Sequence, residues 1–328
     1  MPLMGVGRNF AGNKALHGGA LEAWHALLAS IGQSELLRAT GHRLVWENLQ
    51  SAAHGLRSWL SSDLGSASAT ALDQDTLRSI KEQFAGKPVG GLQFSGTGHI
   101  RDLRAARLAM REAFIKNGGV WHRNAVSQIE QTADGARIVV KDAPHLNTSC
   151  GAEDVIILCA GVRSADILHQ DFGKLPMIAE RGYHLQLEQN SLARHALQSP
   201  IVFEDRSLII TPFSHGLRLA SFTEFSSADA PADIAKWQRL KRHASELGIN
   251  ADAQTSSTWM GSRPTLPDYM PAIGRSTRCP NLIIACGHNH LGLTLAAITG
   301  QLVRQLVRRQ VTAIDISALA PKRYLKNF

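Results

Sequence analysis

Residues 286–300, CGHNHLGLTLAAITG, combine two histidines with two glycines between a strand-like run and a helical pattern. The run 281–285 is typical of a buried strand, and the apolar positions after it have helical spacing: Leu291, Leu295, Ile298, Leu302 and Leu306. Backbone N–H groups at the start of a helix are unpaired and, with the helix dipole, favour negative charge. Glycine at 287 and 292 would let a ligand approach this backbone. The pattern alone fits either a packed turn or a site for an electron-rich ligand edge.

One arginine stands in the Gly/Pro-rich segment 261–274, GSRPTLPDYMPAIG. The segment has little of the pattern of a surface helix. A guanidinium in general can bind a carboxylate through two parallel hydrogen bonds, which a lysine cannot do as well, and an arginine in a surface loop is the competing interpretation. Two further stretches have strand character: IILCAG at 156–161, a second buried strand that ends in glycine, and RGYHLQL at 181–187.

The remaining chain supplies the elements that must position these groups. Helical spacing predicts helices over 21–31, 103–116, 164–168 and 231–247. Short strands are predicted over 120–121, 126–130, 137–141 and 154–158, with Asp134-Gly135 as a hairpin signal. From residue 177 the alternation is typical of antiparallel strands, at 183–187, 208–211, 217–222 and 255–260. The predicted fold class is mixed α/β (α+β), in which an inserted antiparallel layer splits a nucleotide-binding-like layer.

Composition sets further limits. The 328 residues are 44% hydrophobic and 19% charged, with a net charge of 35 − 27 = +8. The positive charges are spread out, which fits a solvated basic surface or attraction for anionic ligands. No interleaved aromatic and basic motif predicts nucleic-acid binding. The four cysteines form no C-x-x-C pair, so no metal site is expected. No signal peptide or membrane-spanning run is recognised, and we expect a cytoplasmic protein; peripheral association with the inner membrane stays open.

These motifs together resemble the D-amino-acid oxidase and dehydrogenase superfamily of FAD enzymes. The resemblance is carried by G-x-R-P-x-x-P-D-x-x-P-x-I-G at 261–274, G-H-x-H-L-G-L-T-x-A at 287–296, IILCAG and RGYHLQL, and it runs through nearly the whole chain. The bacterial D-amino-acid dehydrogenase branch, including D-hydroxyproline dehydrogenases, is the most similar. The resemblance implies an incomplete Rossmann-like FAD/NAD(P)-binding layer and an antiparallel substrate domain. It divides the chain into a helical or cap region with part of the substrate domain (1–95), part of the FAD-binding layer (96–175), the antiparallel domain (176–265) and the C-terminal FAD-binding part (266–328).

The resemblance also implies which residues contact FAD. The 286–297 stretch would lie against the isoalloxazine ring, with the helix that begins near Leu291 pointing its positive end at the N1–C2=O edge. The Val126 backbone would face the adenine, and Ala160 and Gly161 would end the dinucleotide-side strand. Arg163 stands where the family often has an aromatic residue. The implied cofactor-binding set is Val126, Ala160, Gly161, Gly287, His288, His290, Leu291, Gly292, Leu293 and Thr294.

For the substrate, the resemblance implies that Arg263 takes the carboxylate. Tyr183 matches a substrate-domain tyrosine, with His184 in reach of the same site, and a core tyrosine is the competing interpretation. For His288 and His290 the resemblance implies either hydrogen bonding at the ring or contact with the substrate. A packed turn histidine is the competing interpretation for each, and for His290 the two interpretations are equal. We expect Arg263, Tyr183 and the 287–292 turn to line one cavity. The predicted reaction is oxidation of a D-amino acid or related secondary amine to an imino acid, by hydride transfer to flavin N5.

The family's N-terminal strand, G-x-G-x-x-G turn and helix have no counterpart in this sequence. Gly5-Val-Gly7 has Phe10 in place of the third glycine, and Gly96-Thr-Gly98 has Arg101 there. Three explanations are open: a truncated product or misassigned start, one subunit of an assembly whose partner supplies the nucleotide half, or a degenerate paralogue without FAD. We favour the first, and expect the 328 residues alone to retain little FAD. The electron acceptor, and whether the enzyme is an oxidase or a dehydrogenase, are left open.

Overall fold

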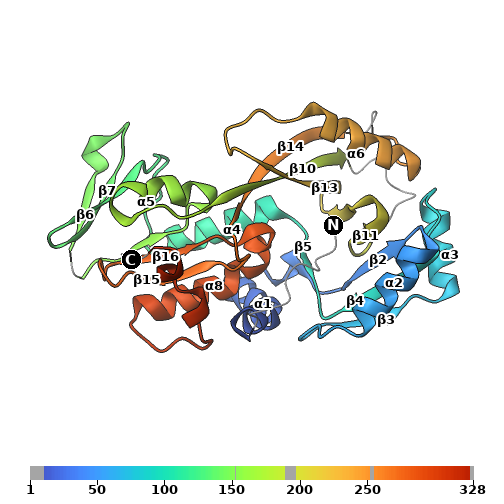
Figure 1. Cartoon of the computed structure of the whole chain (residues 1–328), viewed down its shortest axis with the longest axis horizontal. Helices are drawn as coiled ribbons and strands as arrows, with labels where there is room; N and C mark the ends of the chain where they lie inside the picture. Colours follow the sequence, from blue (N-terminus) through green and yellow to red (C-terminus); the bar gives the residue numbers. More distant parts are fainter. Residues whose placement is uncertain (1–10, 152, 189–196, 252–254, 326–328) are drawn as a thin grey trace.

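The structure is a computed structural model that describes residues 11–151, 153–188, 197–251 and 255–325. Its largest sheet has eight strands in the order β14-β10-β13-β12-β11-β2-β4-β3 (Figure 1). The strands are β2 (His42–Trp46), β3 (Ser68–Ala71), β4 (Gly90–Ser95), β10 (Ile178–Glu188), β11 (Ile201–Phe203), β12 (Leu208–Phe213), β13 (Gly216–Ser226) and β14 (Thr255–Thr265). All neighbours pair antiparallel except β11 and β2. The antiparallel layer predicted from 183–187, 208–211 and 217–222 is therefore confirmed.

Alternation along the strands gives this sheet two different faces. One face carries Tyr183, Leu185 and Leu187, and α3 (Gln74–Gln83) and α6 (Ile234–Glu246) contribute to the same apolar core. Both helices begin with an aspartate whose carboxylate accepts a bond from the first turn, Asp73 for α3 and Asp233 for α6. The opposite face is covered by α2 (Leu49–Leu60) only near β2 and β4. Near β10 and β14 that second face carries polar side chains instead.

A second sheet contains β16, the strand that precedes the 287–292 turn. Its order is β15-β16-β9, for Ala272–Arg275, Leu282–Cys286 and Ile156–Leu158. β16 and β9 pair in parallel, so the prediction that 155–158 and 282–285 are neighbouring parallel strands, in a layer separate from the antiparallel sheet, is confirmed. Next to it lie α5 (Ser164–Phe172) and α8 (Gly292–Val307), and α1 (Ala11–Ser30) packs against α8. The chain therefore combines a Rossmann-like layer with an antiparallel one.

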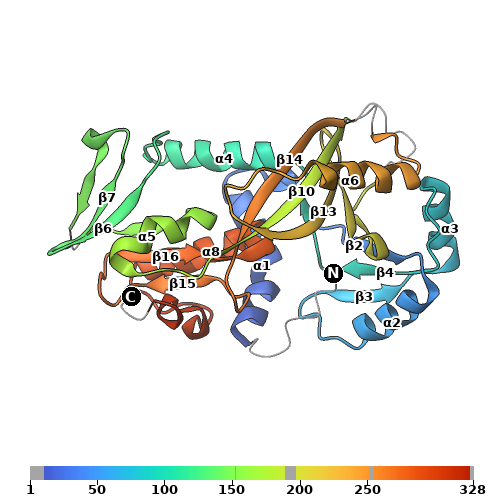
Figure 2. The same cartoon turned by 45° about the horizontal axis from the view of Figure 1, so that its top comes forward.

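A three-stranded meander and one long helix complete the arrangement. The meander is β6 (Gln128–Thr132), β7 (Gly135–Val139) and β8 (Thr148–Cys150), and the predicted hairpin at Asp134-Gly135 is confirmed. Figure 2 shows α4 (Leu103–Lys116) running from the meander toward the large sheet. Its bounds match the prediction, and Asp102 caps it. The short pair β1 (Leu37–Arg38) and β5 (His99–Ile100) lies beside α1.

One sequence prediction about strands was wrong, and one correctly predicted strand is longer than expected. Residues 120–121 form no strand: Val120 and Trp121 are 71% and 54% exposed, because no described strand runs beside them. The strand predicted over 255–260 continues to Thr265, through Pro264. A proline is tolerated there because β14 is the outermost strand of its sheet. Among the described helices, none is both long and apolar enough to cross a membrane.

Candidate active site

The turn between β16 and α8 is tightly built. Gly287 has φ +78°, and a Cβ at this position would overlap the Leu266 side chain, so only glycine fits without strain. Asn289, with φ +45°, donates from its amide to the Tyr269 carbonyl at 2.9 Å and accepts from the Leu291 N–H at 3.1 Å. By contrast, a Cβ on Gly292 would meet only the Cβ of His288, at 3.8 Å. Packing therefore requires Gly287, whereas Gly292 leaves open backbone.

The first turn of α8 has no side-chain cap. The N-cap position is Leu291, whose apolar side chain cannot accept a hydrogen bond from the first-turn N–H groups. Leu293, in that turn, is 48% exposed. Trp24 of α1 donates to the Leu293 and Thr294 carbonyls at 3.0 and 3.2 Å, which fixes this turn against α1. Leu293 and Thr294 then line a cavity of about 930 Å³. The positive end of the helix dipole and its N–H groups are thus available to an electron-rich ligand.

The cavity is bounded by α1, residues 62–67, the 96–98 turn, β5 and the first turn of α8. Its charged and titratable lining is mostly basic: Lys14, His17, His42, His99 and one acid, Asp63. Burial lowers the pKa of His42 to about 4, and its ring stacks on Phe94 at 4.5 Å between centroids. The volume lies in the range of ligand and cofactor sites. Lys14 is paired with Asp63, and burial lowers the pKa of His17, His42 and His99, so the lining offers mainly neutral polar groups.

The two histidines of the turn have different positions. His288 Nε2 lies 3.0 Å from the Thr299 hydroxyl inside α8, and burial lowers its pKa to about 4. Its backbone also bridges to Thr265 of β14, so it ties the turn to both layers. Desolvation lowers the pKa of His290, whose charge interacts with Glu180 and Arg263. His17, in the cavity lining, interacts with His290 in turn. His288 thus stabilises the turn, and His290 stands between the cavity and Arg263.

The buried state of His288 predicts an acid-sensitive fold. Its pKa is about 4 in the folded protein against 6.5 when exposed, so protons bind the unfolded chain preferentially. The contribution of His288 to the free energy of unfolding should be complete above about pH 6.5 and should decrease as the pH drops toward 4. Between pH 7 and pH 5, the free energy of unfolding should fall by on the order of 2 kcal/mol less in His288→Asn than in the unaltered chain. Urea unfolding at both pH values measures this, with His25→Asn at an exposed position of α1 as control. Equal losses in both proteins would contradict the assignment.

Arg263 lies on the polar face of the large sheet. Its Cα partner across the β10–β14 pair is Glu180, and Nη1 donates to Glu180 Oε1 and to the Phe222 carbonyl, both at 3.3 Å. The guanidinium lies over Gly182, where a Cβ would overlap it. Burial lowers the pKa of Arg263, and Glu180 opposes that shift. The contact of β14 with Asn289–Leu291 and the Thr265–His288 bridge place this strand beside the 287–292 turn. Neither Arg263 nor the turn is among the residues that line the 930 Å³ cavity, so the structure does not bear out the prediction that they line one cavity.

His184 shares that face with Arg263. Its ring stacks on Trp259 of β14 with centroids 5.0 Å apart. Burial, with a smaller contribution from Arg218, lowers the pKa of His184 to about 4, so its ring is neutral near pH 7. The Trp259 indole lies over Gly261 just as the Arg263 guanidinium lies over Gly182. His184 and Arg263 therefore lie on the same face of two paired strands, but not side by side: His184 pairs with Trp259 and Arg263 with Glu180, with the Gly182–Gly261 pair between them.

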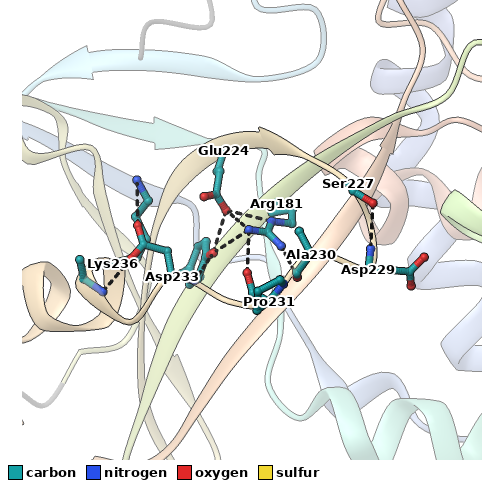
Figure 3. A network of polar contacts seen from close by, with 10 residues as sticks. Arg181, Glu224, Ser227, Asp229, Ala230, Pro231, Asp233 and Lys236 are labelled. Carbon is teal, nitrogen blue, oxygen red and sulfur yellow. Dashed lines mark hydrogen bonds and ion pairs between the residues drawn. The ribbon is translucent and has the colours of Figure 1, made fainter.

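The expectation that Tyr183 lines the same cavity was wrong. Because β10 alternates, Tyr183 points to the apolar face, is 1% exposed and packs edge-on against Trp237 of α6. Its hydroxyl donates to Glu224 at 2.7 Å and accepts from the Asp233 N–H at 3.1 Å. Figure 3 shows the surrounding network, in which Arg181 bonds Glu224 and the 230–231 carbonyls. Tyr183 is thus a core residue, the alternative kept open above.

The residues predicted to contact the dinucleotide part of the cofactor form a less complete site than the turn before α8. Ala160 and Gly161 follow β9, as predicted, and Gly161 has φ +57° with open space around it. Arg163 pairs with Asp229 and Asp166. Val126 is 37% exposed in an irregular segment before β6. The outer edge of β9 has no described strand beside it, and Ile157 there is 44% exposed. The described residues contain no strand, glycine-rich turn and helix that would hold a diphosphate.

Sequence reasoning missed four residues on the polar face: Glu180, Gly182, Arg218 and Trp259. The period of two along β10 was the available signal, since 180 and 182 share a face with 184. Arg218 and Trp259 could be added only once the strand register was known.

Comparison with known proteins identifies the chain. The family model described as DAO, FAD dependent oxidoreductase, matches residues 7–306. The chain belongs to this family. Its relatives include the D-amino-acid oxidase of Bradyrhizobium diazoefficiens, 26% identical over 258 residues, and D-amino acid dehydrogenase 1 of Mesorhizobium japonicum, 30% identical over 185 residues. These alignments cover 77% and 56% of this chain, and 59% and 44% of the relatives, so the chain spans about half of their length.

Solved structures of similar fold support the architecture of this FAD-dependent oxidoreductase. Glycine oxidase from Geobacillus kaustophilus superposes with a TM-score of 0.77 at 19% identity, covering 93% of this chain and 82% of that one. Iminodiacetate oxidase from Chelativorans sp. BNC1 gives 0.77 at 16% identity, covering 96% and 86%. For the family's cofactor, the residues present fit the ring end: the uncapped start of α8, the open backbone at Gly292 and the adjoining cavity. The described part of the chain does not build the phosphate end.

Proposed function

We propose that this chain carries the substrate face and the ring end of the cofactor site of an FAD-dependent enzyme that oxidises amino acids. The substrate we propose is a D-amino acid, or a related secondary amine such as D-hydroxyproline, and the product is the imino acid. The observation that carries the proposal is the position of Arg263, on a polar sheet face beside the uncapped start of α8. The names of the relatives, D-amino-acid oxidase and D-amino acid dehydrogenase, support it.

Each group on this face has a role in the proposal. Arg263 binds the carboxylate and so orients the substrate's α-carbon. His184 and Trp259 form a flat, neutral wall beside it. The first turn of α8, Gly292–Thr294, would offer backbone N–H groups to the electron-rich edge of the ring, and Gly292 leaves that backbone free of a side chain. FAD, when bound, supplies the oxidation by accepting a hydride at N5. The protein's own contribution is therefore positioning, and it needs no strong base.

We also propose that polypeptide outside the described residues completes the phosphate end at the β9 edge. A parallel strand is normally paired on both sides or covered, whereas Ile157 on β9 is 44% exposed. Either a preceding segment of the same polypeptide or a partner subunit could complete this edge.

A cofactor measurement tests this completion. The 328-residue chain, expressed alone, should retain little or no FAD, because the residues that the structure describes build no diphosphate-binding turn. Co-expression with a polypeptide that carries a strand, G-x-G-x-x-G turn and helix should raise the flavin content, read from the flavin absorption of the purified protein. Stoichiometric flavin in the chain alone would contradict the proposal.

The activity itself is tested on the FAD-containing protein with matched D- and L-amino acids and an artificial electron acceptor. We expect reduction of the acceptor with D-amino acids or D-hydroxyproline, and the imino acid or its hydrolysis product in equal amount. A parallel assay with O₂ alone separates oxidase from dehydrogenase. A flavin-loaded protein that oxidises none of these amines would contradict the proposed function and favour a non-catalytic paralogue.

A further inference from the structure

Arg263, which we propose binds the substrate carboxylate, is held from one side by the buried acid Glu180. Glu180 is 4% exposed, and its two oxygens have different partners. Oε1 accepts from Nη1 of Arg263 at 3.3 Å, and Oε2 accepts from the Thr265 hydroxyl at 3.1 Å. Thr265 is itself 1% exposed and lies on β14 two residues beyond Arg263. The carboxylate therefore has one fixed orientation, set by the strand that also carries the arginine.

The backbone supplies a second constraint on the same nitrogen. Phe222 lies at an irregular point of the β10–β13 pairing and has φ +69°, which is rare for a large residue. Its carbonyl accepts from Nη1 of Arg263 at 3.3 Å. Strained backbone of this kind persists where surrounding structure fixes it and often marks a functional position. Nη1 is thus bonded by an acid from β10 and a carbonyl from β13.

The rest of the guanidinium has no such partners. Nε and Nη2 form no hydrogen bond with the residues that the structure describes, and Gly182 leaves the space beneath the group free of side chains. A guanidinium can bind a carboxylate through the Nη1–Nη2 edge or the Nε–Nη2 edge. With Nη1 already bonded twice, the Nε–Nη2 edge is the one left for a two-point contact.

We propose that Glu180 is a positioning residue: it fixes Nη1 of Arg263 so that the Nε–Nη2 edge is presented to the substrate carboxylate. The proposal rests on the proposed function of Arg263. A different role for the same acid would be that of a counter-ion that competes with the substrate for the arginine. The two roles predict opposite effects on substrate binding. A competing counter-ion weakens carboxylate binding because of its negative charge, whereas a positioning residue strengthens it because its oxygen fixes the orientation of the guanidinium.

Two conservative variants of Glu180 separate the effect of its oxygen position from the effect of its charge. Glu180→Gln keeps an oxygen in reach of Nη1 and removes the charge, and Glu180→Asp keeps the charge and withdraws it by one methylene. Benzoate serves as the carboxylate probe, and its binding to the full chain is followed by the NMR signal of the Arg263 Nε–H group. We expect Glu180→Asp to raise the dissociation constant about tenfold and Glu180→Gln to change it by less than about threefold. Glu130→Gln and Glu130→Asp, at a solvent-facing ion pair in the β6–β7 hairpin, are the matched controls.

Opposite results would overturn the proposal. If Glu180→Gln tightens benzoate binding severalfold while Glu180→Asp leaves it unchanged, the acid acts as a competing charge. If benzoate does not shift the Arg263 signal in the unaltered chain, the presented edge does not bind carboxylates. In the FAD-containing protein, Glu180→Asp should raise KM for the amino acid more than it lowers kcat. Failure of that protein to oxidise any amino acid would refute the proposed function alone, since benzoate binding is measured separately.

Discussion

Arg263→Lys in the FAD-containing protein should raise the KM for the amino acid strongly while leaving flavin binding intact. A lysine keeps the positive charge but has no Nε–Nη2 edge, and one ammonium group cannot hold both Glu180 and a substrate carboxylate in two-point geometry. Loss of the bidentate contact should cost on the order of 1.5–3 kcal/mol, which is about a 10- to 150-fold increase in KM. Steady-state kinetics and the flavin content of the purified variant measure the two parts.

The matched control for this substitution is Arg78→Lys, at an exposed ion pair with Asp75 on α3. It should leave KM unchanged, because exposed pairs contribute little and α3 lies on the other face of the sheet. An unchanged KM in Arg263→Lys would show that the arginine does not bind the substrate carboxylate. The proposed substrate class would then lose the residue on which it mainly depends.

Arg181→Met should lower the free energy of unfolding by about 3 kcal/mol. Arg181 is 2% exposed and bonds Glu224 at 2.9 Å and the Ala230 and Pro231 carbonyls at 2.6 and 3.2 Å (Figure 3). A methionine fills similar volume but leaves the two carbonyls without their donor, and leaves Glu224 with the Tyr183 hydroxyl but without the arginine. The network joins β10, β13 and the segment before α6, so its loss should loosen the apolar core behind the site.

Urea denaturation of the two proteins gives this difference directly. Arg78→Met removes an arginine from an exposed ion pair and should change stability by less than about 1 kcal/mol. Tyr183→Phe should have an intermediate effect, since it removes one hydroxyl bonded to Glu224 and Asp233. A loss below about 1 kcal/mol in Arg181→Met would mean that water replaces the missing donor.

The sequence predicted the strand, turn and helix around 281–307 well, because a buried run that ends in glycine and a helical apolar period are both local patterns. The extent of β14 was missed because Gly261 and Pro264 are typical of loops, and only the strand's place at the sheet edge makes them acceptable. The role of Tyr183 could not be fixed from RGYHLQL, since either set of alternate residues on β10 could face the core.

Glu180 shows a different limit of sequence reasoning. Its partner Arg263 is 83 residues away, and the pair exists only because β10 and β14 are neighbours in one register. No local pattern near residue 180 indicates a buried acid, and burial of a carboxylate is unfavourable unless partners are present. The open edge of β9 has the same origin: a strand's need for a neighbour is visible only in three dimensions.

The paired glycines 182 and 261, which lie opposite each other on β10 and β14, set the depth of the substrate face. The Arg263 guanidinium and the Trp259 indole lie flat on this bare backbone, so a single methyl group on either glycine would lift one of them outward. Alanine at 182 would move the charged group, and alanine at 261 the aromatic one. The reach of the carboxylate anchor and the room for a substrate's side chain could therefore be redesigned independently, by two substitutions at glycines that replace neither Arg263 nor Trp259.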